Sequence, residues 1–240
     1  CVTGLGETGK FLCESGVDKL AFTGSTATAK RVAATCALSM TPVVLECGGK
    51  DPVIVDRDAD LKKAADAAIW SAMSNAGQTC IGAERVYVHQ DVADKFIEDC
   101  LRIASAIKPG APGVGNYGPA TMPKQLAIIE GHIKDAIARG GKVLLGGIES
   151  VHAPYVDPVI IADVPEDSTA ITEETFGPTL VINRVATMEE AVALTNASRY
   201  GLGASVWSKR NGKKIARSLH CGMVSINSVI AFAAIASVPF

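Results

Sequence analysis

Short apolar runs alternate with stretches of helical periodicity along the chain. Near the start, the runs at 20–22, 42–46 and 52–55 have the length of buried strands, and the stretch at 27–38 has helical spacing. Strands that alternate with helices in this way are typical of α/β proteins. The pattern therefore predicts an α/β fold.

The clearest helix is predicted at 60–76. Its apolar residues recur at helical spacing and form one continuous face. They are Leu61, Ala64, Ala65, Ala68, Ile69, Ala72 and Met73. Asp60 is a suitable N-cap, because its carboxylate can accept the free N–H groups of the first turn, and Gly77 is a suitable terminator.

The rest of the chain continues the alternation. Strands are expected at 85–88, 143–145, 158–161, 179–182 and 204–207. Helices are expected at 91–107, 123–139, 188–196 and 210–219. Loops are expected at 77–83 and at 109–118, where glycine and proline are frequent.

Composition and charge argue against two classes of partner. The net charge of −2 and the aromatic content of 5% leave no basic stripe with interleaved aromatics, so nucleic acid is not expected. The longest apolar run, at 229–236, is far shorter than the roughly 18 residues of a membrane span, so no membrane is expected either.

Seven cysteines stand at positions 1, 13, 36, 47, 80, 100 and 221. Their number is odd and no two are closely spaced, which predicts neither a disulfide framework nor a metal site. We therefore expect a reduced, cytoplasmic protein in which most cysteines are small buried hydrophobic residues.

The two ends of the chain are unusual. It begins at Cys1 rather than at a methionine, and it stops at 238–240, directly after an apolar run. Because native termini are usually polar and frayed, we expect a fragment of a longer protein.

Three segments carry candidate chemistry, and the first is NAGQTC at 75–80, which ends in Cys80. A cysteine in a loop after a helix, with a flexible glycine before it, can present its sulfur to a cleft. The backbone N–H of the same loop can face the oxygen that becomes negative when a carbonyl is attacked. The alternative, which this segment alone favours, is a buried structural cysteine.

The second segment, LECGGK at 45–50, places Glu46 at the end of an apolar strand beside two glycines. Strand ends in α/β folds border ligand crevices, and a partly desolvated glutamate has a raised pKa that suits a general base. Two other interpretations stay open: an ion pair between Glu46 and Lys50, or a glutamate that caps the next segment.

The third segment, FTGST at 22–26, is predicted to run from a strand through a tight turn into a helix. Free N–H groups at a helix N-terminus, with hydroxyls beside them, suit a pyrophosphate. Upstream, the glycines of segment 4–9 predict a glycine-rich turn, although their spacing does not match G-x-G-x-x-G. The alternative for both segments is ordinary N-capping and turn chemistry.

Together these segments resemble the aldehyde dehydrogenase family. The matches run in order along almost the whole chain: FTGST at 22–26, LECGGK at 45–50, GQTC at 77–80, EETFGP at 173–178, YGL at 200–202, Gly222, Asn227 and PF at 239–240. The glutamate and cysteine motifs are specific to that family. Ala29 and Cys47 stand where the family often has glycine and leucine, and we expect Cys47 to pack inward.

The resemblance implies a two-domain organisation. Residues 1–48 are expected to be the C-terminal remnant of a Rossmann-like dinucleotide-binding domain. Residues 49–240 are expected to be an α/β catalytic domain, truncated at its C-terminal end. The family members are usually dimers or tetramers, so a homo-oligomer is expected for the full-length protein.

The resemblance also implies roles for individual residues. Cys80 is the nucleophile that attacks an aldehyde carbon, and Glu46 is the general base that activates water to hydrolyse the resulting thioester. The oxyanion would be held by the Cys80 backbone N–H and by an asparagine that lies upstream in the family. No metal is implied.

The implied cofactor is NAD or NADP, and four residues are expected to bind it. Gly24 and Ser25 contact the pyrophosphate, Glu174 contacts the nicotinamide-side ribose, and Phe176 packs near the same half of the cofactor. A solvated surface acid is the alternative for Glu174. Because most of the cofactor domain lies upstream in the family, we expect the 240 residues alone to bind NAD poorly and to be inactive.

The segment 228–232 is implied to line the aldehyde tunnel, and its lack of charge favours an apolar or aromatic aldehyde over a carboxylate-bearing semialdehyde. Two other functions are considered. One is a cofactor-free thiol hydrolase or acyltransferase that uses Cys80 and Glu46. The other is a non-catalytic structural or binding protein, which the intact Cys80 and Glu46 argue against.

Overall fold

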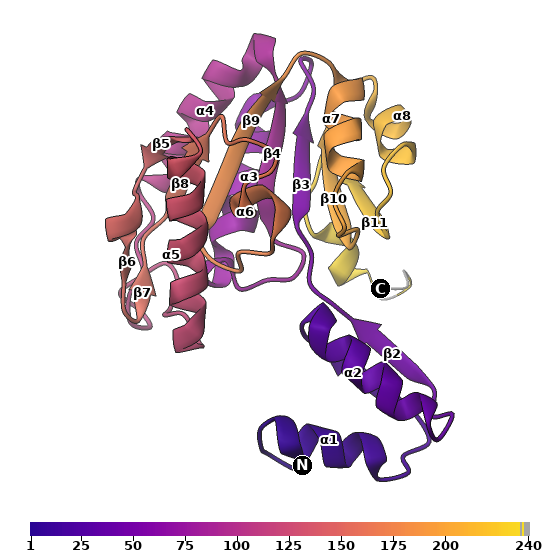
Figure 1. Cartoon of the computed structure of the whole chain (residues 1–240). Coiled ribbons are helices and arrows are strands. Elements are labelled where there is room, and N and C mark those ends of the chain that lie inside the picture. Colours follow the sequence, from indigo (N-terminus) through magenta and orange to yellow (C-terminus); the bar gives the residue numbers. More distant parts are fainter. Residues whose placement is uncertain (236, 238–240) are drawn as a thin grey trace. The chain divides into compact units, whose positions relative to one another are not determined.

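The structure is a computed structural model that describes residues 1–235 and 237, with only the backbone of Phe232. The chain divides into two compact units, Cys1–Gly48 and Gly49–Phe240, called unit 1 and unit 2 below (Figure 1). The motif expected at 239–240 lies outside the described residues. What each unit does stays a prediction.

Unit 1 is a short α/β element. Helix α1 (Gly6–Glu14) is followed by β1 (Leu20–Thr23), α2 (Thr26–Ala37) and β2 (Val43–Glu46). The two strands pair in parallel, with Thr23 opposite Glu46. The small core between the helices and the strands contains Cys13, Leu20, Val32 and Cys36.

The glycine-rich turn predicted at 4–9 is wrong, because α1 begins there. The Gly9 N–H donates to the Leu5 carbonyl at 3.2 Å, as in an ordinary helical turn. Glu7 lies in the first turn, where a negative charge interacts favourably with the helix dipole. Burial of Cys13 against unit 1's core offsets the low helix propensity of the two glycines.

Unit 2 is built on a seven-stranded sheet in the order β11-β10-β3-β4-β9-β8-β5. All neighbouring strands are parallel except β5, which is antiparallel to β8. The strands are β3 (Asp51–Val55), β4 (Ala83–His89), β5 (Lys142–Leu145), β8 (Val159–Ala162), β9 (Thr179–Val185), β10 (Gly203–Trp207) and β11 (Met223–Ile226). A two-stranded hairpin, β6 (Val151–His152) and β7 (Tyr155–Val156), lies outside this sheet.

Helices cover both faces of the sheet (Figure 1). One face packs against α3 (Leu61–Met73) and α4 (Gln90–Ala104) through Val53, Val86 and Leu180. The other face is covered by α5 (Pro123–Ala138), α6 (Thr169–Thr172), α7 (Met188–Asn196) and α8 (Gly212–Arg217). Because side chains alternate along each strand, Ile54 and Tyr87 point to that second face.

Three short 3-10 helices complete the chain: η1 (Ser74–Gly77), η2 (Ile148–Ser150) and η3 (Ala231–Ala234). The first of them corrects the predicted helix at 60–76. Its N-cap is confirmed, because Asp60 accepts the Lys63 N–H, but the helix ends at Met73. Asn75 and Ala76 take left-handed conformations with φ of 55° and 59°, which an α-helix cannot contain.

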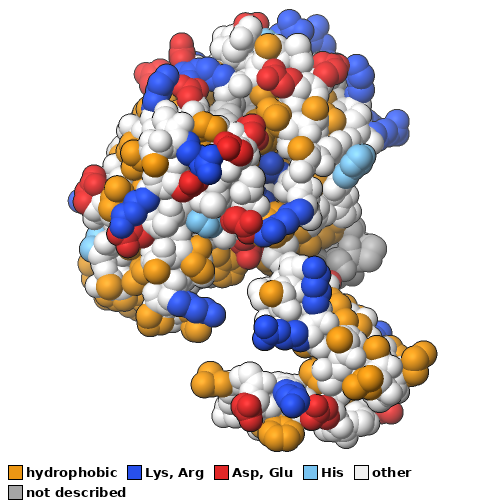
Figure 2. All heavy atoms as spheres, in the orientation of Figure 1, with side chains coloured by type: hydrophobic (Ala, Val, Ile, Leu, Met, Phe, Trp, Pro, Cys, Tyr) orange, Lys and Arg blue, Asp and Glu red, His pale blue; other side chains and the backbone are white. Residues whose placement is uncertain are grey.

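The predicted α/β fold is confirmed, and most predicted strands and helices lie within a few residues of those observed. Neither α6, β11 nor the β6–β7 hairpin was predicted, because each is short or lacks a clear period. Within residues 1–235 and 237, none of the helices combines the length and the apolar character needed to cross a membrane. On the face that Figure 2 shows, Lys, Arg, Asp and Glu side chains lie among hydrophobic ones.

Candidate active site

The expected site residues of unit 2 gather at one edge of its sheet. Cys80 precedes β4, Glu174 and Phe176 precede β9, and Asp51 begins β3. Because β3, β4 and β9 are parallel, their amino ends lie at the same edge. We call this the amino edge, and the opposite end of these strands the carboxyl edge.

The loop that carries Cys80 is held by unusual backbone conformations and by the side chains of Asn75 and Gln78. Gly77 follows the left-handed Asn75 and Ala76 with a φ of 69°. The Gln78 side chain donates to the Asn75 carbonyl at 3.0 Å and accepts the Thr121 N–H at 2.8 Å. The loop is thus a fixed structure, and its glycine is required for its conformation.

Two glycines bring the expected motifs of unit 2 into contact. A Cβ on Gly77 would lie 2.0 Å from the Gly177 carbonyl oxygen, so the cysteine loop packs directly on the EETFGP segment. A Cβ on Gly49 would lie 2.6 Å from the Cys80 carbonyl oxygen, and the Gly49 N–H donates to Glu174 Oε1 at 3.2 Å. Gly49 therefore lies between Cys80 and Glu174.

Cys80 differs in exposure from the cysteines that fill the core. Cys13, Cys36 and Cys100 are buried, whereas Cys80 is half-buried. Burial raises the pKa of the Cys80 thiol, and the negative charges of Asp51 and Glu174 raise it further, although backbone hydrogen bonds of Cys80 and Ile81 act in the opposite direction. The thiol is therefore protonated at neutral pH, and a nucleophilic role requires a base.

Asp51 is a second titratable group at the amino edge. It is 6% exposed, and among the described residues its carboxylate accepts one hydrogen bond, from the Gly203 N–H at 3.1 Å. Burial raises the pKa of Asp51 to about 7, because one hydrogen bond does not replace the lost hydration. The site therefore contains a carboxyl group that titrates near neutral pH.

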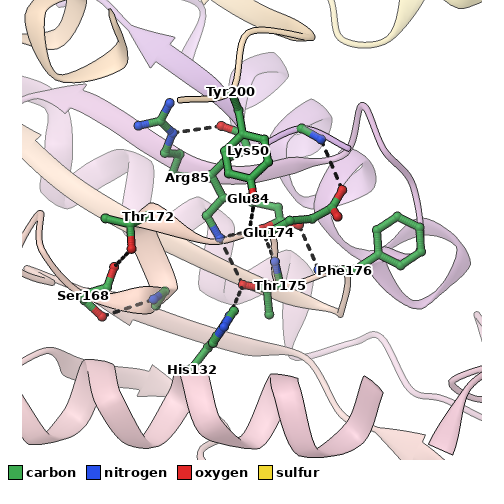
Figure 3. Close-up of polar contacts among 12 residues, drawn as sticks. Lys50, Glu84, Arg85, His132, Ser168, Thr172, Glu174, Thr175, Phe176 and Tyr200 are labelled. Atoms are coloured by element: carbon green, nitrogen blue, oxygen red, sulfur yellow. Dashed lines mark hydrogen bonds and ion pairs between the residues drawn. The ribbon is translucent and has the colours of Figure 1, made fainter. Parts of the chain in front are cut away.

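Glu84 was not singled out by the sequence, and it is the centre of a buried polar cluster (Figure 3). Its Oε2 accepts Lys50 Nζ at 2.5 Å and the Thr175 N–H at 2.8 Å, and its Oε1 accepts the Phe176 N–H at 2.9 Å. Lys50 Nζ also donates to Thr175 Oγ1 at 3.0 Å. The one available signal was a charged pair, Glu84 and Arg85, at the start of an otherwise apolar strand.

Lys50 excludes one interpretation of the second motif. It is 1% exposed and pairs with Glu84, so it is not the surface partner of Glu46. Burial lowers the pKa of the Lys50 ammonium, and the facing carboxylate of Glu84 counteracts that change.

His132 of α5 approaches the same cluster, with its Nδ1 3.0 Å from Thr175 Oγ1. Burial lowers the pKa of His132, and the positive charge of Lys50 lowers it further. Figure 3 shows Lys50, Glu84, Thr175 and His132 converging on one point between the sheet and α5. The cluster thereby connects α5 to the amino edge.

Glu174 and Phe176 lie on a segment with an unusual backbone. Phe176 has a φ of 53°, in the left-handed region that non-glycine residues rarely adopt. Glu174 is partly buried, and this burial raises its pKa, to which the charge of Glu84 adds. Glu174 is therefore not a fully solvated surface acid.

In unit 1, the expected residues lie at the carboxyl ends of the two strands. The Glu46 carbonyl accepts the Gly24 N–H at 3.0 Å, which joins the two motifs. Ser25 is the N-cap of α2, since its hydroxyl accepts the Thr28 N–H at 3.3 Å. The capping role considered for Ser25 is thus present. Glu46 belongs to unit 1 and Cys80 to unit 2.

The segment expected to line the substrate tunnel follows β11. Asn227 exchanges two hydrogen bonds with the backbone of Ser208, each of 3.1 Å. Ile230 has a φ of 56°, and the chain then enters η3. The segment is thereby anchored at its start to the end of β10.

Among residues 1–235 and 237, no group of three or more His, Cys, Asp or Glu side chains is arranged to hold a metal ion.

The fold and site together define an α/β protein with a cysteine-centred site at the amino edge of a largely parallel sheet. Comparison with known families is more specific. The chain matches the model of the Aldehyde dehydrogenase family over residues 1–240, and it belongs to that family.

Individual relatives agree with the family. The chain is 37% identical over 241 residues to 4,4'-diapolycopene aldehyde oxidase of Methylomonas, covering 100% of this chain and 45% of that protein. It is 38% identical over 228 residues to glutarate-semialdehyde dehydrogenase of Pseudomonas putida, covering 92% and 46%. The chain therefore spans about half the length of the curated relatives it matches.

A solved structure shares the fold. The NADP-dependent glyceraldehyde-3-phosphate dehydrogenase of Bacillus halodurans, crystallised with NADP, superposes with a TM-score of 0.90 at 37% identity. The match covers 95% of this chain and 48% of that one. The aldehyde dehydrogenase fold expected from the sequence is thus confirmed.

Proposed function

We propose that the intact protein oxidises an aldehyde to a carboxylic acid with NAD+ or NADP+, using Cys80 as nucleophile and Glu46 as general base. The observation that carries this proposal is the arrangement around Gly49. There the half-buried Cys80 loop and the Glu174 carboxylate lie on either side of one backbone position. Membership of the aldehyde dehydrogenase family supports the same chemistry.

The residues present fit a dinucleotide. In unit 1, the N-terminus of α2 directly follows β1, and Gly24 and Ser25 form the turn between them. Such a turn offers backbone N–H groups to a pyrophosphate. In unit 2, Glu174 retains Oε2 to accept a ribose hydroxyl, since its bond from Gly49 uses Oε1. When bound, NAD(P)+ supplies the hydride acceptor for the reaction.

Cys80 and Glu46 divide the work on the substrate. The Cys80 sulfur adds to the aldehyde carbon, and the oxyanion accepts the Cys80 backbone N–H. Because the pKa of the thiol is raised, its proton must leave before the attack, and since Cys80 is half-buried we assign its removal to solvent. After oxidation, the acyl group is a thioester on Cys80. Glu46 then takes a proton from a water that hydrolyses it to the acid.

The substrate is proposed to be an apolar or aromatic aldehyde, because the segment 228–232 carries no charge. The names of the relatives include both a 4,4'-diapolycopene aldehyde and glutarate semialdehyde. A comparison of kcat/KM for benzaldehyde and succinic semialdehyde tests this choice. A large preference for the semialdehyde would contradict it.

We also propose that the protein is cytoplasmic and forms a homodimer or homotetramer. Support for the first comes from the seven cysteines, which are all free. The second rests on the resemblance to the family and is tested by light scattering on the intact protein.

The main experiment follows NAD(P)+ reduction by the intact protein with a panel of aldehydes and both cofactors. Wild type is compared with Cys80→Ala, Glu46→Gln and a matched control, Cys221→Ala. Cys221 is a half-buried thiol of the same unit, and burial raises its pKa to about 11, so it makes a poor nucleophile.

We expect Cys80→Ala to abolish turnover, Glu46→Gln to stop after one burst, and Cys221→Ala to retain activity. Loss of activity in the Cys221 variant alone would move the nucleophile to that residue. Ester cleavage through Cys80 without reduction of either cofactor would instead favour a cofactor-free thiol hydrolase.

A further inference from the structure

The carboxylate of Glu84 joins three segments that are far apart in the sequence. It comes from β4, four residues after Cys80, and it binds Lys50, which follows the Gly48-Gly49 pair. It also binds the backbone N–H groups of Thr175 and Phe176. These two residues directly follow Glu174 (Figure 3).

The backbone bonds to Glu84 fix the direction of the Glu174 segment. Both oxygens of the carboxylate are used, one for each of two successive N–H groups. Phe176 adopts its left-handed φ of 53° at this point. A conformation of that kind persists only where the surroundings determine it, and the bond from Phe176 to Glu84 is one such constraint.

Glu84 also acts on Glu174 from the opposite side, through Lys50. The Lys50 backbone is held in place because its carbonyl accepts Arg85 Nε at 2.9 Å. Gly49, the residue before it, donates its N–H to Glu174 Oε1. The Glu84 carboxylate therefore binds the side chain of Lys50, the residue after Gly49, and the backbone of Thr175 and Phe176, the two residues after Glu174.

The chemistry of the cluster requires an ionised carboxylate. Glu84 receives three hydrogen bonds and offers none, and Lys50 is 1% exposed. An amide in its place has one acceptor oxygen and one NH2 donor, and the donor would face an N–H group. Glutamine therefore keeps the shape of the side chain but breaks the bonds on one side.

We propose that Glu84 is a positioning residue for the cofactor half of the site: it sets the placement of Glu174 and Phe176 against the nicotinamide-side ribose. This inference rests on the proposed function. It assigns Glu84 no contact with the substrate or with the cofactor. The competing explanation is an ion pair that only stabilises the fold.

The test measures steady-state kinetics of the intact protein carrying Glu84→Gln. We expect the KM for NAD(P)+ to rise by about tenfold or more, since displacement of a binding residue by about 1 Å has effects of that size. The KM for the aldehyde and the stoichiometry of Cys80 labelling by iodoacetamide should stay unchanged. A purely structural role would lower the labelled fraction and kcat and leave the KM for NAD(P)+ as it was.

Two further variants make the result decisive. Glu166→Gln is the matched control, because Glu166 is a partly buried carboxylate that accepts Tyr87 and Asn183 but no backbone group of 174–176. Its KM for NAD(P)+ should not change. Glu84→Asp keeps the charge that faces Lys50 and shortens the reach, so it should fold and give a smaller rise in the same KM.

The outcomes separate the two proposals. If wild type reduces neither cofactor, the proposed function fails before Glu84 is tested. If wild type turns over and both Glu84 variants keep the wild-type KM for NAD(P)+, the positioning role is overturned. If Glu84→Gln does not fold, the Asp variant decides: an unchanged KM for NAD(P)+ contradicts the inference, and a raised one supports it.

Discussion

Two aspartates at opposite edges of the unit 2 sheet, Asp58 and Asp51, lie in different environments. At the carboxyl edge, Asp58 accepts the N–H groups of Lys209 and Arg210 and the hydroxyl of Ser208. Burial raises the pKa of Asp58, but these hydrogen bonds outweigh it and the net pKa is lowered. At the amino edge, Asp51 has one backbone donor, Gly203, and its pKa rises to about 7.

The difference distinguishes carboxylates that stabilise the fold from a carboxylate that belongs to the candidate site. Asp56, beside Asp58, is 1% exposed and likewise surrounded by donors: Arg57, Ser208 and Asn211. A buried carboxylate that accepts several hydrogen bonds holds neighbouring loops together and thereby stabilises the fold. A carboxylate with few bonds perturbs its neighbours, as Asp51 does with the Cys80 thiol. Perturbed groups of that kind gather at functional sites.

The candidate site of unit 2 also departs from the usual location of ligand sites in α/β proteins. Ligands normally bind at the carboxyl ends of parallel strands. Unit 1 follows this rule, with Gly24 and Glu46 at the ends of β1 and β2. In unit 2 the cysteine loop lies at the amino edge instead. Glu46 was predicted because it ends a strand. Cys80 precedes its strand, so the same rule would not have identified it.

The largest expected effect concerns the buried ion pair of the amino edge. Lys50→Met leaves the Glu84 carboxylate buried without its cation, which should lower the free energy of unfolding by about 3–5 kcal/mol. The control is Lys214→Met on α8, whose ammonium lies 3.7 Å from Glu189 with both side chains exposed. Its cost should be below about 1 kcal/mol.

Urea denaturation of the intact protein measures both values. Equal losses for the two lysine variants would mean that the Lys50–Glu84 pair contributes no more than a surface pair.

The next effect concerns the cysteine loop. Gly77→Ala forces a residue with a Cβ into a φ of 69° and against the Gly177 carbonyl, so we expect a loss of more than about 2 kcal/mol. Gly131→Ala is the matched control. It lies within α5, nothing stands within 4 Å of the added Cβ, and alanine should stabilise the helix by up to about 1 kcal/mol.

Thermal unfolding measures both variants. If the loop has the conformation described, the melting temperature falls for Gly77→Ala and rises for Gly131→Ala. A Gly77 variant that is as stable as wild type would show that the loop tolerates another conformation.

The smallest effect is in the pH dependence of the two edges. Because the folded-state pKa of Asp51 is raised, its contribution to stability is present below about pH 4 and is lost as the pH rises toward 7. The folded-state pKa of Asp58 is lowered, so its contribution is present above its unfolded value and is lost as the pH falls through the folded value.

Asp51→Asn should therefore remove a fall in stability between about pH 4 and 7, and Asp58→Asn should remove a rise in stability that lies below about pH 4. In addition, Asp51→Asn should move the alkylation of Cys80 by iodoacetamide to lower pH, because it removes the charge that raises the thiol pKa. Identical stability profiles for the two variants would remove the distinction between the edges.

Local pattern was sufficient for much of the fold. The apolar run of β3 and the Asp60 cap of α3 were predicted, because strand length and capping chemistry depend on adjacent residues. The segment at 4–9 was not, since glycine favours turns and only the packing of Cys13 makes it helical. Short elements such as α6 have too few residues to show a period.

The site was predicted only where a motif carried it. Cys80, Glu46 and Glu174 were found through a resemblance, and their roles stay predictions. Glu84 was missed because its partners lie 34 and 91 positions away along the chain. No local pattern reports contacts over such separations. An ion pair of Glu46 with Lys50, one of the alternatives left open, is contradicted because Lys50 pairs with Glu84, and the sequence could not indicate that partner for the same reason.

The position of Gly49 has a practical consequence for protein engineering. Gly49 is the first residue of unit 2, and it already makes contacts of the candidate site. Its N–H donates to Glu174, and its lack of a Cβ leaves room for the Cys80 carbonyl. A chimera that exchanges unit 1 for a homologous segment should therefore be joined before Gly49. With a junction one residue later, position 49 would come from the homologous segment, and any residue other than glycine there would disturb Cys80 and Glu174 together.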